Sequence, residues 1–193
     1  MPEDLMDTMS MVMHGNIDSP LFLGLQETIG PADAAKLLDL LNSGTDLNGD
    51  VRRKMDEMYG KAGASGVAIC SGRAAFKYLL EKDGKAIGFD DPDFRFLPIR
   101  IKMRKGLELL ARWFELNYGV KTSLNSEEKE FRIEVKDSVG SSSNTNLCDF
   151  TSGLLQGFLA WISGGKFYVV RETECRASGA EKCSFSVGKN PLE

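Results

Sequence analysis

The chain has 193 residues, which suits a single domain with a substantial hydrophobic core. It carries 24 basic and 28 acidic residues, for a formal net charge of −4. This slightly acidic balance argues against a surface that follows the phosphates of nucleic acids, so we expect no nucleic-acid partner.

The N-terminal segment lacks the features of a secretory signal. Residues 1–13 alternate methionines with acidic and small polar residues, without a basic flank or a continuous apolar run. The most apolar stretch, residues 153–170, is interrupted by glycines and by Lys166, so no membrane span is predicted. We therefore expect a cytoplasmic protein with reduced thiols.

Three segments are expected along the chain. Residues 1–20 are interpreted as a flexible N-terminal arm, residues 21–191 as a single domain, and residues 192–193 as a cloning scar. The single histidine, His14, lies in the arm and is expected at the surface rather than in catalysis. The apolar segment Leu21–Leu25 is expected to dock on another molecule in an oligomer.

The first 118 residues are predicted to be mostly helical. Pro31 begins the first helix, and Gly44 and Gly60 end the first and second. The four predicted helices cover residues 31–43, 50–59, 64–82 and 99–118. The third is rich in glycine, alanine and serine, for which the sequence favours close helix packing, with access for a ligand as the alternative.

The remainder of the chain combines four predicted strands with one helix. Apolar and polar residues alternate in the first strand pair, which places Phe131, Ile133 and Val135 on a buried face. A helix follows, and the last two strands form a hairpin around Gly179. The strands are placed at residues 120–124, 130–136, 167–174 and 183–187, and the helix at 148–163. This order predicts an α+β domain, with an antiparallel sheet of about four strands packed against a helical layer.

Three cysteines and a glutamate gather in the last quarter of the chain. Cys148 begins the last helix, Cys175 and Cys183 flank the hairpin turn, and Glu172 precedes Cys175 by three residues. Zinc binding is the favoured interpretation, because thiolates and carboxylates suit a tetrahedral zinc site. A Cys175–Cys183 disulfide and plain packing of small apolar side chains are the alternatives. Residues three apart on a regular strand face opposite sides, so Glu172 requires a bend and Glu174 is the alternative ligand.

The same region resembles a known family. Its motif is Gly153-x-x-x-Gly157, then Gly164-Gly165, then Val170-Arg171-Glu172-Thr173-Glu174-Cys175-x-x-x-Gly179-x-x-x-Cys183-x-Phe185. This motif is similar to the C-terminal signature of the 4-vinyl-reductase, or hydrocarbon-binding, domain family. That family includes archaeal small-ligand-binding proteins, a bacteriochlorophyll-biosynthesis protein and aromatic-sensing domains of bacterial activators, and it shares its fold with TRAPP tethering subunits. The resemblance is strong over residues 148–187 and looser back to Leu21.

The resemblance implies a zinc site that clips the hairpin to the last helix. In the aromatic-sensing members, zinc is held by a cysteine at the start of the last helix, by the glutamate of Glu-x-x-Cys and by two hairpin cysteines. The matching positions here are Cys148, Glu172, Cys175 and Cys183. Such a site is structural, because four protein ligands leave no position for a reacting water.

The resemblance also implies a function. It predicts a homodimer that binds a small hydrophobic or aromatic molecule, as a sensor or carrier, without turning it over. The sequence contains no nicotinamide, flavin or phosphate-binding motif, so an enzyme is not expected. The aromatic residues expected to line the ligand pocket are Phe94, Phe96, Trp113, Phe114, Phe131, Phe158, Trp161 and Tyr168.

Two alternative functions follow from other members of the family. One is a reductase or substrate-carrier role in tetrapyrrole (bacteriochlorophyll) biosynthesis. The other is a TRAPP-like assembly adaptor, in which a cysteine on an early helix carries an acyl chain. Cys70 is the candidate for such acylation, and a buried free cysteine is the simpler interpretation of this residue.

Overall fold

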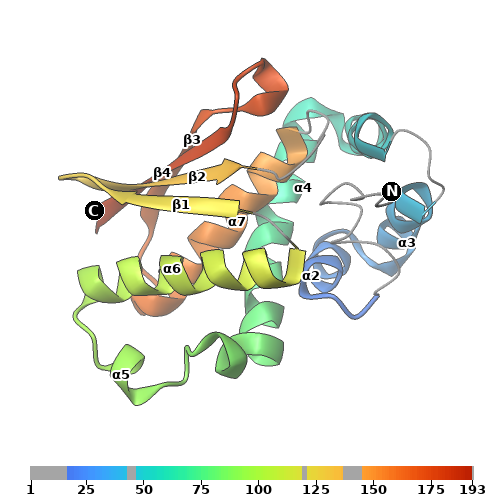
Figure 1. The fold of residues 1–193 in the computed structure, drawn as a ribbon. Helices are drawn as coiled ribbons and strands as arrows, with labels where there is room; N and C mark the ends of the chain where they lie inside the picture. Colours follow the sequence, from blue (N-terminus) through green and yellow to red (C-terminus); the bar gives the residue numbers. More distant parts are fainter. Residues whose placement is uncertain (1–16, 43–46, 119–120, 137–144, 193) are drawn as a thin grey trace, which may run out of the picture.

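The computed structural model describes residues 17–42, 47–118, 121–136 and 145–192 (Figure 1). The helices are α2 (Pro20–Ile29), α3 (Pro31–Asn42), α4 (Leu47–Ile87), α5 (Pro92–Arg95), α6 (Ile99–Tyr118) and α7 (Thr145–Ile162). The strands are β1 (Lys121–Ser126), β2 (Glu130–Lys136), β3 (Tyr168–Glu174) and β4 (Cys183–Pro191), with a short 3-10 turn, η1 (Arg176–Ser178), between the last two. The predicted α+β fold class is confirmed.

The four strands form one antiparallel sheet in the order β1-β2-β4-β3. β2 pairs with β4 so that Ile133 lies opposite Phe185 and Phe131 lies opposite Val187. All four of these side chains are buried, and they form the apolar face of the sheet. α6 packs against β1, and α7 packs against β3 (Figure 1). The sheet therefore buries its apolar side chains under two helices from different parts of the chain.

The apolar segment near the N-terminus belongs to the core of this chain. α2 begins after Ser19, whose side-chain oxygen accepts a hydrogen bond from the backbone N–H of Phe22 at 3.2 Å. Leu21, Phe22 and Leu25 are buried, and α2 packs on α4. The expectation that this segment docks on another molecule is wrong, because α4 of the same chain already covers it. It therefore gives no reason to expect an oligomer.

α4 crosses α7 with almost no side-chain atoms between the two backbones. A Cβ atom on Gly72 would lie 2.1 Å from the carbonyl oxygen of Phe150, and one on Gly153 would lie 2.0 Å from that of Ile69. Only glycine fits at these two positions. The small residues of the predicted 64–82 helix thus serve close packing, as the sequence favoured.

Gly60 divides α4 into two helical parts. Its φ of 71° and ψ of 161° are not helical, which confirms the predicted break. The second part continues to Ile87, beyond the predicted end, and α5 occupies the predicted turn at residues 90–93. Within the described ranges, none of the helices combines the length and apolarity that crossing a bilayer requires.

Candidate metal centre

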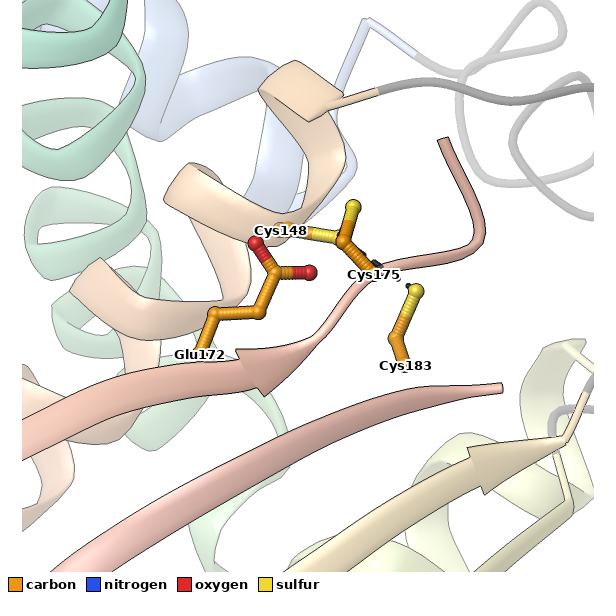
Figure 2. Close-up of side chains that lie close together, drawn as sticks. All are labelled: Cys148, Glu172, Cys175 and Cys183. Atoms are coloured by element: carbon orange, nitrogen blue, oxygen red, sulfur yellow. Dashed lines mark hydrogen bonds between the residues drawn. The ribbon is translucent and has the colours of Figure 1, made fainter. Parts of the chain in front are cut away.

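Four side chains from three elements meet at one end of the sheet. Cys148 lies in the first turn of α7, Glu172 lies on β3, Cys175 directly follows β3, and Cys183 begins β4. Figure 2 shows their sulfur and carboxylate atoms directed toward one another. The three sulfurs and one carboxylate oxygen all lie within 4.8 Å of one another. The structure thus brings together the four residues that the sequence selected as metal ligands.

A bulge in β3 allows Glu172 and Cys175 to face the same side. Glu172 lies opposite Phe185, whereas Glu174 lies opposite Ser184, so two steps along β3 match one step along β4. The extra residue, Thr173, donates a side-chain hydrogen bond to the carbonyl oxygen of Ser184 at 3.2 Å. A bulge of this kind shifts the alternation of side chains by one position. It supplies the bend that Glu172 needed in order to reach the cluster.

Glu174, the alternative ligand, is excluded from the cluster. Its side chain is 46% exposed, and its carboxylate lies 3.9 Å from the Lys182 ammonium group. The bulge directs Glu172 inward, so Glu174 is left at the surface beside a basic residue.

The hairpin turn fixes the positions of the two hairpin cysteines. Gly179 adopts a left-handed conformation with φ 93°, which a glycine accepts without strain. The N–H of Ala180 donates to the carbonyl oxygen of Cys175 at 3.1 Å, which closes the turn. The N–H of Arg176 donates to the Cys183 sulfur at 3.5 Å. One turn thus orients both cysteines toward α7.

The distances between the sulfur atoms distinguish a metal site from a disulfide. Cys148 Sγ lies 3.5 Å from Cys183 Sγ and 3.8 Å from Cys175 Sγ. A disulfide bond would require about 2.05 Å, and all four cysteines of the chain are free thiols in the structure. Tetrahedral zinc with zinc–sulfur bonds of about 2.3 Å would separate its sulfur ligands by about 3.8 Å. The observed spacing fits the metal site.

Burial of a carboxylate beside three thiols also favours a cation. Cys148 is 4% exposed, and the Glu172 Oε1 atom is buried without a hydrogen-bond partner. A buried carboxylate oxygen with no partner is costly, and a bound cation removes that cost. Three sulfur donors and one carboxylate oxygen suit a metal with an affinity for sulfur. The plain packing of small apolar side chains does not account for Glu172.

The thiols strongly influence one another's pKa values. The Cys148 thiol donates a hydrogen bond to Cys183, and this bond lowers the pKa of Cys183 to about 6. The same bond, together with burial and the neighbouring Glu172 carboxylate, raises the pKa of Cys148. Cys183 is therefore the thiol that most readily becomes a thiolate, which is the form that binds metals.

The predicted pocket aromatics separate into different environments. Phe94, Phe158 and Trp161 pack against Phe76 and Phe89, with ring centroids between 5.1 and 6.4 Å apart. A Cβ atom on Gly106 would lie 2.4 Å from the Phe158 ring, so α6 also presses on this cluster. These rings fill the space between helices, and they act as packing groups.

The remaining predicted residues lie elsewhere. Trp113 and Phe114 form a separate edge-to-face pair on α6, with centroids 5.0 Å apart, while Phe131 and Tyr168 are buried on the sheet. Phe96 is 88% exposed, so its prediction as a residue of an internal pocket is wrong. Its place after α5 turns it outward.

Two further sequence-based candidates lie outside the site. Cys70 is exposed on α4, so its interpretation as a buried thiol is wrong. His14 lies outside the described residues. Thr173 is a contributor that the sequence analysis did not single out, although the three-residue spacing of Glu172 and Cys175 already required an irregular strand.

The fold and the cluster define an α+β domain with a candidate metal centre that joins its C-terminal hairpin to its last helix. Residues 131–189 match the family model of the vinyl-4-reductase domain. The match confirms the resemblance to the 4-vinyl-reductase family over that part of the chain. No curated protein sequence matches the chain.

Solved structures of H-NOX proteins share the fold. A mutant H-NOX protein from Shewanella oneidensis in its Fe(II) ligation state is 12% identical, with 97% of each chain covered and a TM-score of 0.56. An H-NOX domain from the same organism in its Fe(II)CO state is 10% identical, covers 88% of this chain and 97% of its own, and has a TM-score of 0.55. A vinyl-4-reductase family protein from Methanocaldococcus jannaschii is 15% identical over 92% of this chain and 96% of its own, with a TM-score of 0.42. At these identities, the likeness to the H-NOX proteins shows the fold alone.

Proposed function

We propose that Cys148, Glu172, Cys175 and Cys183 hold one structural zinc ion. The observation that carries this proposal is the convergence of three sulfur atoms and one carboxylate oxygen within 4.8 Å of one another. Zinc bound by four protein ligands supplies a cross-link and leaves no open position for a reacting water. The four residues would tie the β3–β4 hairpin to the first turn of α7.

We further infer that the domain binds a small hydrophobic or aromatic molecule without turning it over. The family match over residues 131–189 supports this function, because the family resemblance implies ligand binding. The Trp113–Phe114 pair is the better candidate for the binding region, because the Phe158 cluster is filled by its own rings. Phe114 is only partly buried and lies on the helix that covers the sheet, so part of its ring is open to a ligand.

Tryptophan fluorescence can test this assignment directly. The chain has two tryptophans, Trp113 and Trp161. In a Trp161→Phe variant, all tryptophan emission comes from Trp113. Titration with phenol, xylene and a tetrapyrrole is expected to quench this emission with saturation, whereas the Trp113→Phe variant is expected to give little quenching. Saturable quenching of Trp161 alone would move the ligand to the Phe158 cluster, and no saturable response to any probe would count against ligand binding.

Mass spectrometry distinguishes the alternative functions. Native spectra are expected to show a non-covalent small molecule that disappears under denaturing conditions. A covalent acyl adduct on Cys70 would instead support the TRAPP-like adaptor, for which the exposure of this thiol leaves no buried chain at that point. Reduction of a tetrapyrrole vinyl group by the protein with a nicotinamide cofactor would support the biosynthetic role.

The homodimer and the cytoplasmic location rest on the family resemblance and the sequence. Light scattering at micromolar concentration tests the first prediction, and a mass that stays at that of a single chain would reject it. Cell fractionation tests the second.

A further inference from the structure

Positive charge is concentrated at the start of α6. Residues 95–105 read Arg-Phe-Leu-Pro-Ile-Arg-Ile-Lys-Met-Arg-Lys, with five basic residues and no acidic one, in a chain whose formal net charge is −4. The rest of the chain is therefore more acidic than the whole. This cluster of cations is a local feature that overall composition does not explain.

Most of these cations have no ionic partner among the described residues. Only Arg104 forms an ion pair, with Glu108 at 3.0 Å. Arg100 donates to the Asn190 side-chain oxygen at 3.0 Å and Lys102 to the carbonyl oxygen of Arg95 at 2.6 Å, and both acceptors are neutral. The first turn of α6 has no acidic residue, although the helix dipole disfavours cations at an N-terminus. The stability of the helix does not account for this arrangement.

Large apolar side chains protrude among the cations. Phe96 is 88% exposed, and Ile101 is 54% exposed on the outer side of α6. The Arg100–Asn190 bond places the end of β4 beside the start of α6, as Figure 1 also shows. The N–H of Leu192 donates to the carbonyl oxygen of Phe167 at 2.7 Å, so Phe167, which is 64% exposed, extends the same surface. We name this the basic-apolar surface; its members are Arg95, Phe96, Arg100, Ile101, Lys105 and Phe167.

We propose that the basic-apolar surface docks on an anionic lipid bilayer. Protruding apolar side chains can enter the boundary between headgroups and acyl chains, while flanking arginine and lysine residues contact anionic headgroups. A protein partner would need a hollow for each of these projecting side chains, whereas a bilayer yields to them. The inference rests on α5, α6 and the ends of β3 and β4, and it is independent of the metal centre and of the proposed ligand.

Vesicle flotation with the full chain tests the proposal. The protein is expected to float with phosphatidylcholine vesicles that contain about 30% phosphatidylserine, and not with pure phosphatidylcholine. Binding is expected to fall at about 0.5 M salt, because the charges are exposed and screened. The double variants Phe96→Ser/Ile101→Ser and Arg95→Gln/Lys105→Gln are each expected to weaken binding at least tenfold.

Matched variants control for general effects on surface and fold. Leu116→Ser removes an apolar side chain that is 75% exposed at the other end of α6, and Arg112→Gln removes an exposed cation from the same helix. Both are expected to bind like the unmodified protein, with unchanged circular dichroism in every variant. Equal binding to neutral vesicles, or equal loss in the control variants, would overturn the proposal. Absence of vesicle binding would also overturn it, and binding to polyglutamate or duplex DNA instead would assign the surface to an acidic protein or a nucleic acid.

Discussion

Cys148 Sγ lies 3.5 Å from Cys183 Sγ, although 35 residues separate them in the chain. The contact joins the first turn of α7 to the first residue of β4, and it forms only when the sheet and the helix have both assembled. The candidate metal centre is therefore a product of the tertiary fold, unlike a zinc site built within one short loop.

The first prediction concerns the metal content. The purified protein is expected to hold about one zinc per chain, and Cys183→Ala is expected to lose it and to unfold at a lower temperature, because a structural zinc contributes folding free energy. Elemental analysis and thermal unfolding measure both effects. Cys70→Ala is the control and should retain the metal, since this exposed thiol lies outside the cluster. Zinc-free protein with a Cys175–Cys183 disulfide, after preparation without chelator, would contradict the prediction.

The second prediction separates the two neighbouring glutamates. Glu172→Gln preserves the shape of the side chain but removes the charged oxygen donor, so competition with a chelator is expected to show at least tenfold weaker zinc binding. Glu174→Gln is expected to bind zinc normally, because Glu174 lies at the surface beside Lys182. Equal affinities in the two variants would show that Glu172 is not a ligand.

The third prediction tests the crossing of α4 and α7. Gly153→Ala would place a Cβ atom 2.0 Å from the carbonyl oxygen of Ile69, so the helices must separate. The expected loss of stability is about 1–3 kcal/mol, as for other overpacked cores. Gly66→Ala on α4 has no atom within 4 Å of the added Cβ, and it is expected to stabilise by up to about 1 kcal/mol through helix propensity. Urea unfolding measures both, and a neutral Gly153→Ala would contradict the packing argument.

The fourth prediction concerns an exposed polar contact between α2 and α4. Glu27 accepts hydrogen bonds from Tyr78 at 2.7 Å and from Lys77 at 3.2 Å, and these bonds lower the pKa of Glu27. A lowered pKa stabilises the fold above the ordinary glutamate pKa, and this contribution is lost as the pH falls through the lowered value. Glu27→Gln is expected to destabilise at pH 7 by less than about 1 kcal/mol, because solvent screens the contact. Thermal unfolding should show the difference shrinking below pH 4.5, the model value for a glutamate; a difference that grows on acidification would contradict the assignment.

The sequence allowed prediction of the features that depend on local pattern. Gly60 and Gly179 require unusual backbone angles, so the helix break and the hairpin turn could be placed from residue type alone. The cysteines and Glu172 could be selected because their chemistry and spacing suit one metal ion. The family resemblance was needed to choose Glu172 over Glu174, since regular strand alternation favours neither without knowledge of the bulge.

Other features depend on which elements meet in space, and the sequence pattern does not contain that information. Leu21 and Phe22 have the composition of an exposed docking segment, yet α4 covers them in the same chain. Phe96 and Phe94 are equally apolar in the sequence, but the turn after α5 exposes one at 88% and buries the other. Aromatic content alone could not separate packing residues from residues that line a ligand site.

The close approach of α4 and α7 at Gly72 and Gly153 has a mechanical consequence. Side chains at a helix interface can change rotamer and so absorb a small shift, but two backbones in direct contact have no such freedom. Cys148 stands five residues before Gly153 on α7, so a pull exerted on the hairpin at Cys148 acts on a rod that is held firmly against α4. A movement that starts at the cluster must therefore either stop there or displace α4 and α7 together, which makes this helix pair the stiff lever of the domain.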